Sequence, residues 1–171
     1  MFAQTKILPK VLTFSQTKYY LFSLTFVGLA AGVPWLLHQF TLAGPKFLPM
    51  HFFVMFAGLL FGWRTGLLVG ALSPLASFGL THMPVMALLP QIVLELAVYG
   101  FVAGFLRERG LNVWVSLVSA MVLGRLARLA LSSDLSFMQA STPGMVLQLA
   151  LIPVVIYLLQ KFLFKKSETK I

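Results

Sequence analysis

Long apolar segments follow one another along this chain, with only short turns between them. A helix needs about 20 apolar residues to cross the hydrocarbon core of a bilayer, where it must bond its own backbone because no water is present. Apolar residues make up 59% of the sequence and charged residues only 10%, well below the roughly 25% of soluble domains. The sequence therefore predicts an all-α integral membrane protein.

The apolar segments divide the chain into six transmembrane helices that form one compact bundle, a single domain over residues 1–171. Residues 1–18 are expected to be a cytoplasmic or interfacial lead-in without a cleavable signal peptide, and residues 165–171 a basic cytoplasmic tail. Pro74, next to Ser73, is expected to break the third helix at a cavity. The predicted helices cover about residues 19–40, 48–61, 66–79, 86–106, 111–131 and 143–164.

The basic residues predict the orientation of the bundle. With the N-terminus in the cytoplasm, ten lysines and arginines fall on the cytoplasmic side, and Lys46 falls in an outer loop. Such an excess is typical of cytoplasmic loops, so both termini are predicted there and the net charge of +9 does not indicate a nucleic-acid partner. The ten residues are Lys6, Lys10, Lys18, Arg64, Arg107, Arg109, Lys161, Lys165, Lys166 and Lys170.

Small residues recur at helical spacing in several of the predicted helices. Glycines stand at positions 28 and 32, at 58, 62, 66 and 70, and at 100 and 104. Because small residues let helix backbones approach closely in lipid, most of these glycines are expected to pack inside the bundle. Contact with a partner protein is the alternative, and it is most plausible for the first helix.

Arg125, Arg128 and Glu95 are charged residues deep inside predicted helices, all in the outer half of the membrane. Such charges are costly and normally face a bundle interior or a wet cavity. An ion pair between Glu95 and Arg125 either locks two helices or orients Arg125 toward a ligand. Arg128 has no acidic partner in the predicted helices, and only Asp134 in an outer loop remains for it. A surplus cation suits a ligand with a carboxylate or phosphate.

Further polar and adaptable side chains gather toward the same outer end, although a histidine at such a position is more often an interfacial residue than a ligand contact. Cysteine is absent, and the histidine spacing fits no compact metal motif. No nucleophile stands in a hydrolase-like motif either. We therefore expect no metal, no cofactor and no catalytic site. The gathered residues are Trp35, His38, Met50, His51, His82, Met83 and Gln91.

Two stretches resemble the substrate-binding S components of energy-coupling factor (ECF) vitamin transporters. One is the outer loop that enters the second helix, GPKFLPMH at residues 44–51. The other is a glycine ladder, AGLLFGWRTGLLVG at residues 57–70, with Trp63 where proline is common in the family. The run LGR at residues 123–125 is also similar, and the resemblance extends over about residues 20–160.

The resemblance implies a pocket open to the outside that binds a vitamin tightly, built by the outer ends of the later helices and capped by the first and third outer loops. It also implies a membrane coupling subunit and two cytoplasmic ATPase subunits as partners, since this chain carries no nucleotide-binding motif. Family members dock through small residues of the first helix. The corresponding residues here are Gly28, Ala31 and Gly32.

Taken together, these features predict the high-affinity substrate-binding subunit of an ECF-type transporter in the inner (cytoplasmic) membrane. The substrate is expected to be a small anionic micronutrient, similar to pantothenate, lipoate or biotin, with its acid group on Arg125 and Arg128. The alternatives are a stand-alone carrier of a small metabolite without an ATPase and, less favoured, a membrane enzyme. Further ligand contacts are expected from Glu95, Gln91, His38, His51, His82, Trp35, Met50 and Met83.

Overall fold

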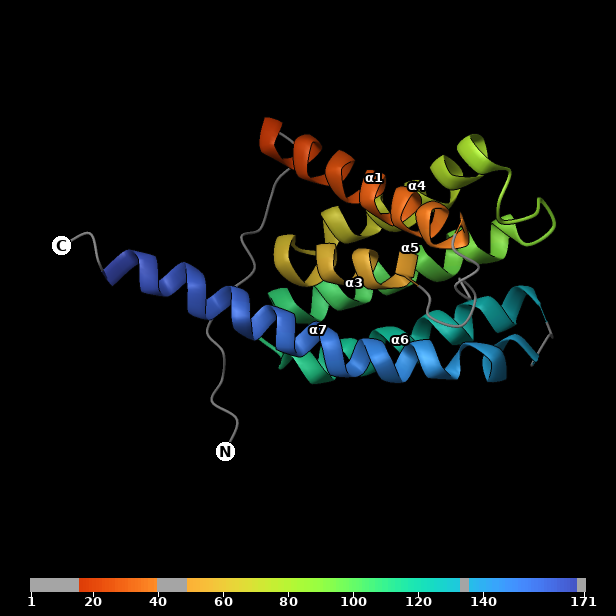
Figure 1. Cartoon of the computed structure of the whole chain (residues 1–171). Helices are drawn as coiled ribbons and strands as arrows, with labels where there is room; N and C mark the ends of the chain where they lie inside the picture. The colour runs from red at the N-terminus through yellow and green to blue at the C-terminus, as the bar shows by residue number, and fades with distance from the viewer. Residues whose placement is uncertain (1–15, 40–48, 133–135, 169–171) are drawn as a thin grey trace.

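The computed structural model of the chain describes residues 16–39, 49–132 and 136–168, with side chains for residues 16–37, 49–132 and 141–158. Within these ranges every regular element is an α-helix, as the sequence predicts (Figure 1). The lead-in up to residue 15, the loop 40–48 with Lys46, and Asp134 lie outside the described residues.

Six helices follow one another through the described residues, close to the predicted ranges. The third of them ends at residue 81 and the fourth starts at residue 89, a few residues later than expected, because the turn between them carries Pro84. The helices are α1 (Thr17–Gln39), α3 (Pro49–Phe61), α4 (Trp63–Thr81), α5 (Leu89–Glu108), α6 (Val113–Leu131) and α7 (Ser136–Glu168).

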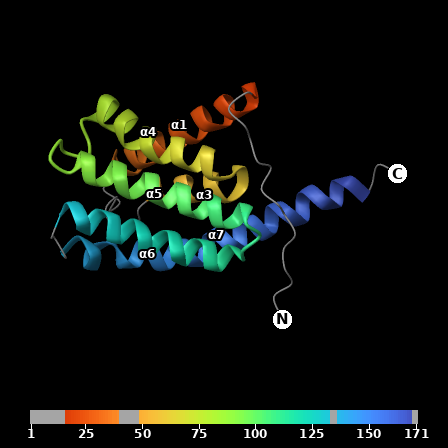
Figure 2. The same cartoon turned by 180° about the vertical axis from the view of Figure 1, so that it is seen from behind.

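The helix α5 lies at the centre of the bundle and packs against α3, α4 and α6. On one side α1 covers α3 and α4, and on the other side α7 packs on α6 and touches α3. Figures 1 and 2 show the same order from front and back, from α1 and α4 across α3 and α5 to α6 and α7. Residues on α5 are therefore best placed to join several helices at one point.

Glycines bring α4 and α5 into backbone contact. A Cβ atom added to Gly66 would overlap the carbonyl oxygen of Gly100, and one added to Gly100 would overlap that of Gly66. Gly70 stands in the same way against the backbone of Leu96, and Gly104 against the turn at Gly62 and Trp63. The prediction that the small residues of this ladder pack inside the bundle is confirmed, because no larger side chain fits between these helices.

Two predicted helix boundaries are wrong. Pro74 does not break its helix: α4 runs unbroken from Trp63 to Thr81, with Pro74 buried inside it. Packing on both sides holds the helix across the one hydrogen bond that proline cannot make. The last helix is also longer than residues 143–164, because the chain continues as a helix through Pro143 and into the lysine-rich tail.

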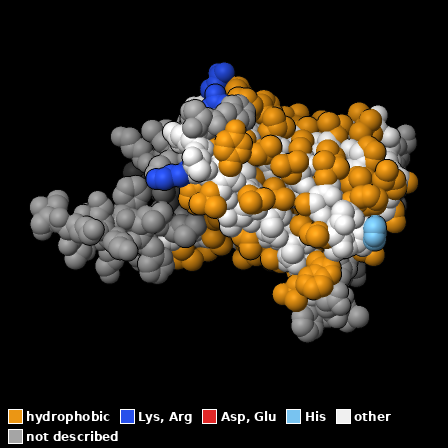
Figure 3. Space-filling model, turned by 90° about the horizontal axis from the view of Figure 1, so that it is seen from above, with side chains coloured by type: hydrophobic (Ala, Val, Ile, Leu, Met, Phe, Trp, Pro, Cys, Tyr) orange, Lys and Arg blue, Asp and Glu red, His pale blue; other side chains and the backbone are white. Residues whose placement is uncertain are grey.

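Among the described residues, four helices are long and apolar enough to cross a membrane, and α3 is a shorter apolar helix. Large apolar side chains such as Leu21, Leu24 and Leu126 lie exposed on the outside of the bundle, where lipid would cover them. The face in Figure 3 is mostly hydrophobic, with lysine and arginine side chains near one end and a histidine near the other. The chain is a multi-pass membrane protein.

Candidate functional site

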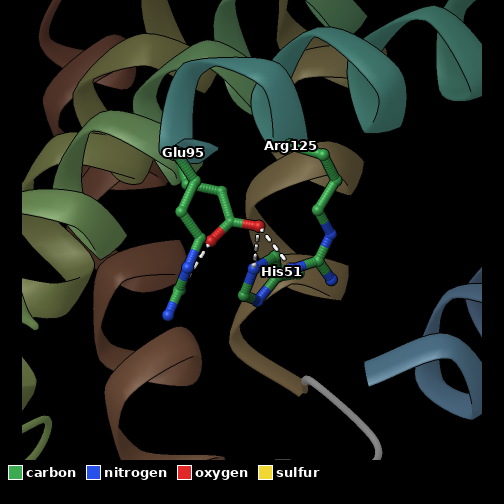
Figure 4. A network of polar contacts seen from close by, with 4 residues as sticks. His51, Glu95 and Arg125 are labelled. Atoms are coloured by element: carbon green, nitrogen blue, oxygen red, sulfur yellow. Dashed lines mark hydrogen bonds and ion pairs between the residues drawn. The ribbon is translucent and has the colours of Figure 1, made fainter. Parts of the chain in front are cut away.

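Four polar side chains from three helices meet inside the bundle, and we call them the Glu95 cluster: His51, Glu95, Arg125 and Arg128 (Figure 4). One carboxylate oxygen of Glu95 lies 2.9 Å from Nη1 of Arg125 and 3.6 Å from Nε2 of His51. The other oxygen accepts a 2.9 Å hydrogen bond from Nη1 of Arg128. All four side chains are at most 7% exposed, so the cluster is part of the bundle interior.

The topology of the bundle explains why these residues meet. His51 lies in the first turn of α3 and Glu95 about two turns into α5, so both lie near the starts of their helices. Arg125 and Arg128 lie near the end of α6, which runs antiparallel to α5 beside it. The three-residue spacing of the arginines puts both on one face of α6, toward α5.

Gly124 allows α6 to approach α5 closely at the level of the cluster. A Cβ atom added to Gly124 would lie 3.2 Å from the carbonyl oxygen of Glu95 and 3.2 Å from the ring of Tyr99. That separation is tighter than an ordinary van der Waals contact, so a larger side chain would push the helices apart. Gly124 therefore helps to set the distance between α5 and α6, and with it the distance between Arg125 and Glu95.

The predicted ion pair between Glu95 and Arg125 is present, but the prediction for Arg128 is wrong. Arg128 was expected to have no acidic partner in the helices, whereas it shares the Glu95 carboxylate with Arg125. Each arginine takes a different oxygen, which spacing along a single helix could not indicate. Within the part of the chain that the structure describes, the Glu95 carboxylate thus joins two guanidinium groups of α6.

Charged side chains are costly in a membrane interior and are normally paired or hydrogen-bonded there. Guanidinium groups only donate hydrogen bonds and bind carboxylates and phosphates in a planar, often bidentate manner. His51 adds a buried ring whose Nδ1 atom has no hydrogen-bond partner among the described residues. The cluster is therefore suited to hold an anion, with His51 available for a further polar contact.

Two more of the predicted ligand residues lie beside the cluster. Gln91 precedes Glu95 by one turn of α5, and its side-chain oxygen is buried without a partner among the described residues. Met50 precedes His51 in α3 and packs, partly buried, against the hydrophobic core. Their contact with a ligand stays a prediction.

Three other predicted ligand residues, Trp35, His82 and Met83, do not join the cluster. Trp35 and Met83 are 51% and 55% exposed, and His82 is exposed at the end of α4, where its ring packs edge-on against Phe78. His82 takes a left-handed backbone conformation there, with φ of 57°. The side chain of His38 lies outside the described residues. Any role of these four residues in ligand binding stays a prediction.

The sequence analysis missed Tyr99. It is 1% exposed, and its ring lies edge-on to His51 with 5.2 Å between the ring centroids. Its position one helical turn after Glu95 was the signal that could have indicated it, because residues four apart share a helix face. Tyr99 thus lies between the cluster and the hydrophobic core.

The predicted docking residues of α1 lie on two different faces. Gly28 and Gly32 are exposed, and a Cβ atom added to either would meet nothing within 4 Å. Ala31 is only 3% exposed and packs toward the bundle, so it does not belong to that outward surface. The outer face of α1 thus carries a strip in which Gly28 and Gly32 lie between the exposed side chains of Leu24 and Leu36.

Comparison with known protein families gives a match over most of the chain. The family described as ECF transporter, substrate-specific component, matches residues 22–157. The matched segment contains α3, α4, α5 and α6 in full, and with them the whole Glu95 cluster. Among curated proteins and among solved structures, none matches the chain.

Proposed function

The chain belongs to the family of substrate-specific components of ECF transporters, and from this premise we propose that the Glu95 cluster binds the acid group of its substrate. As a member of that family the protein is a transporter subunit and not an enzyme. The proposed substrate is a vitamin or related micronutrient that is small and anionic, in the manner of pantothenate, lipoate or biotin. It is bound with high affinity for uptake into the cell.

The observation that carries the proposal is the sharing of one buried carboxylate by two buried arginines. A carboxylate or phosphate on the substrate would be attracted to these two guanidinium groups. It would accept hydrogen bonds from Arg125 and Arg128, which are stronger than bonds between neutral groups. Glu95 would then keep both guanidinium groups oriented in the empty site, so that less ordering is needed when the ligand arrives.

The neutral polar part of the substrate would lie between α3 and the start of α5. His51 offers its Nδ1 atom there, and Gln91 offers a buried amide oxygen. Both groups are buried without a described partner, and such groups cost free energy until a ligand or water bonds them. A substrate with a hydroxyl or amide a few bonds from its acid group would satisfy them.

We further propose that six helices span the membrane with both termini in the cytoplasm of the cell, in its inner (cytoplasmic) membrane. The described basic residues outside the cluster support this orientation. Lys18, Arg64, Arg107 and Arg109 all lie where α1 and α4 begin and α5 ends, which is the end opposite to the cluster. By the positive-inside rule that end faces the cytoplasm, so the cluster opens toward the outside.

The family supports association with the membrane and ATPase components of an ECF transporter. We propose one membrane coupling subunit and two cytoplasmic ATPase subunits, with docking along the strip around Gly28 and Gly32. Co-expression with such subunits should make uptake dependent on ATP. Uptake at the same rate without them would instead establish a stand-alone carrier.

Mass spectrometry of small molecules released from the purified full chain tests the proposed substrate class. We expect one acid, carrying a carboxylate or phosphate, in near-stoichiometric amount. The amide of that acid should bind at least about 100-fold more weakly, because loss of a partner from a buried charge pair costs about 3 kcal/mol or more. Release of a neutral or cationic compound, or equal binding of acid and amide, would overturn the proposal.

A further inference from the structure

The turn that joins α4 to α5 is apolar although most of it is exposed. Leu80 is 77% exposed and Met86 68% exposed. Between Arg64 and Glu95 the sequence holds no lysine, arginine, aspartate or glutamate, so the turn and the helical segments on either side of it lack these charged side chains. We call residues 80–88 the apolar turn.

The connection at the other end of α5 has a different composition. Residues 107–112, which lead from α5 into α6, have the sequence RERGLN. Charged and polar residues with a glycine are typical of a turn in water, and Leu111 is the one large apolar side chain among them. The two connections of the same helix therefore indicate different surroundings.

The backbone of the apolar turn forms hydrogen bonds with the turn itself and with the end of α4. The N–H of His82 donates to the carbonyl oxygen of Phe78 at 2.8 Å, and the N–H of Met83 donates to the hydroxyl of Thr81 at 3.2 Å. The N–H groups of residues 88 and 89 donate to carbonyl oxygens inside the turn at 2.9 and 3.3 Å. Backbone groups bonded in this way depend less on water, which suits a turn beside lipid.

The register of α1 against α4 sets the depth of the turn. These two helices pack side by side, and near their starts the hydroxyl of Tyr19 donates a 3.2 Å hydrogen bond to the carbonyl oxygen of Arg64. Trp35 and Leu80 each stand 16 residues further along, which corresponds to about 24 Å of helix. Because tryptophan is enriched at the boundary between lipid tails and headgroups, the apolar turn is expected to start near that boundary.

The apolar turn lies at a corner of the bundle. Figures 1 and 2 show it beyond the ends of α4 and α5, on the side of α1, with α6 and α7 on the opposite side. Arg125 and Arg128 belong to α6, and neither His82 nor Met83 joins the Glu95 cluster. The exposed side chains of the turn therefore face the surroundings of the bundle and not the cluster.

We propose that the apolar turn inserts its side chains into the interface of the outer leaflet, between the lipid phosphates and the first methylene groups of the acyl chains. Its partner is the lipid surface, which it contacts through apolar side chains such as Leu80, Val85 and Met86, and their removal from water drives the contact. The name of the leaflet rests on the proposed orientation, whereas the contact itself is independent of the substrate. It holds the adjoining ends of α4 and α5 at a fixed depth in the membrane.

Spin labels on single cysteines measure this depth in the full chain, because the protein has no cysteine of its own. Met83→Cys and Met86→Cys place the label in the apolar turn. Leu111→Cys is the matched control, an exposed apolar position in the polar connection, and Val122→Cys on the exposed face of α6 is the reference for full immersion in lipid.

Each labelled protein is reconstituted in phosphatidylcholine nanodiscs, which leave both faces of the bilayer open to solutes. Electron paramagnetic resonance with power saturation then gives the collision rate of the label with oxygen, which concentrates in lipid, and with a nickel–EDDA complex, which stays in water. We expect the oxygen-to-nickel ratio at Met86 to approach that at Val122 and to exceed that at Leu111 several-fold. Met83 should give a ratio between those at Leu111 and Val122.

Two results would overturn the proposal. Equal oxygen-to-nickel ratios at Met86 and Leu111 would place the turn in water. Low collision rates with both solutes at Met83 and Met86 would show that protein covers the turn, as it would in a cap over a ligand. The copurified acid is quantified on the same samples, so the two proposals can fail separately: the expected ratio at Met86 in protein that retains no acid supports the lipid contact and contradicts only the substrate class.

Discussion

Arginine appears at both ends of this bundle in opposite surroundings. At one end Arg125 and Arg128 are buried and share the Glu95 carboxylate. At the other end Arg64 and Arg109 lie over aromatic rings at the rim of the bundle. A charge in the membrane interior is costly, whereas a long basic side chain at the rim keeps its charged head near water. The same residue type is thus held by a carboxylate in the interior and by aromatic rings at the rim.

Between the two ends, α4 and α5 touch through glycines with no side chain between them. Such backbone contact leaves no room for a larger side chain between these two helices. We expect the largest effect from a substitution at this contact, a smaller one at the buried end and the smallest at the rim.

The largest effect is expected from Gly100→Val. The new side chain would collide with the backbone of Gly66, and a backbone atom cannot move aside as a side chain can. The cost should exceed the roughly 1–3 kcal/mol of ordinary overpacking, so we expect little folded protein after purification. Size-exclusion chromatography in mild detergent measures the folded fraction.

Gly28→Val is the matched control for this substitution. Gly28 is exposed on α1, and an added Cβ atom meets nothing within 4 Å. The variant should purify like the parent protein, and its thermal unfolding should be unchanged. If both glycine variants behaved alike, the assigned role of the α4–α5 glycine contact would be wrong.

Glu95→Gln, in protein from which the substrate has been removed, is expected to lower the stability less than Gly100→Val but still by a large amount. Two buried guanidinium groups would lose their only described carboxylate, and breaking a buried ion pair costs about 3–5 kcal/mol. The temperature of unfolding in detergent should therefore fall. Adding the acid released from the wild-type protein should recover part of the loss, because its anion takes the place of Glu95. An unfolding temperature that does not change would argue against the charge balance described for the cluster.

The smallest effect is expected at the rim, from Glu108→Ala. This carboxylate accepts the hydrogen bond from the Trp63 N–H and so caps the start of α4. Removing a side-chain cap of this kind costs about 1 kcal/mol of stability. Glu108→Gln keeps an oxygen acceptor and should lose only a fraction of that. Thermal unfolding of the two variants, with equal substrate retention, checks both values.

The helices could be predicted from the sequence because the bilayer imposes a length and a polarity on each of them. Most predicted ends lie within a few residues of the observed ones. The errors arose at prolines: Pro74 and Pro143 were interpreted as a break and a start, yet both lie inside helices that tertiary packing and length sustain. The low helix propensity of proline alone does not show whether the surrounding packing will hold it inside a helix.

The candidate site could be predicted in part. Depth along each helix put Glu95, Arg125 and Arg128 at one level, and the structure brings them together with His51. Sequence spacing could not show that one carboxylate serves both arginines, because that depends on how closely α5 and α6 approach at Gly124. Exposed residues such as Trp35 were predicted as ligand contacts because they lie near the same ends of their helices as the Glu95 cluster.

The substrate-binding role proposed for the buried arginines of the Glu95 cluster is tested most directly by comparing Arg125→Ala with Arg107→Ala, since both remove a buried arginine but at opposite ends of the bundle. Each is purified in the same detergent, its folded state is checked by size exclusion, and the amount of the copurified acid per protein is determined by mass spectrometry. We expect the acid to be lost from folded Arg125→Ala and kept by Arg107→Ala. Equal retention by both folded variants would contradict the proposed role.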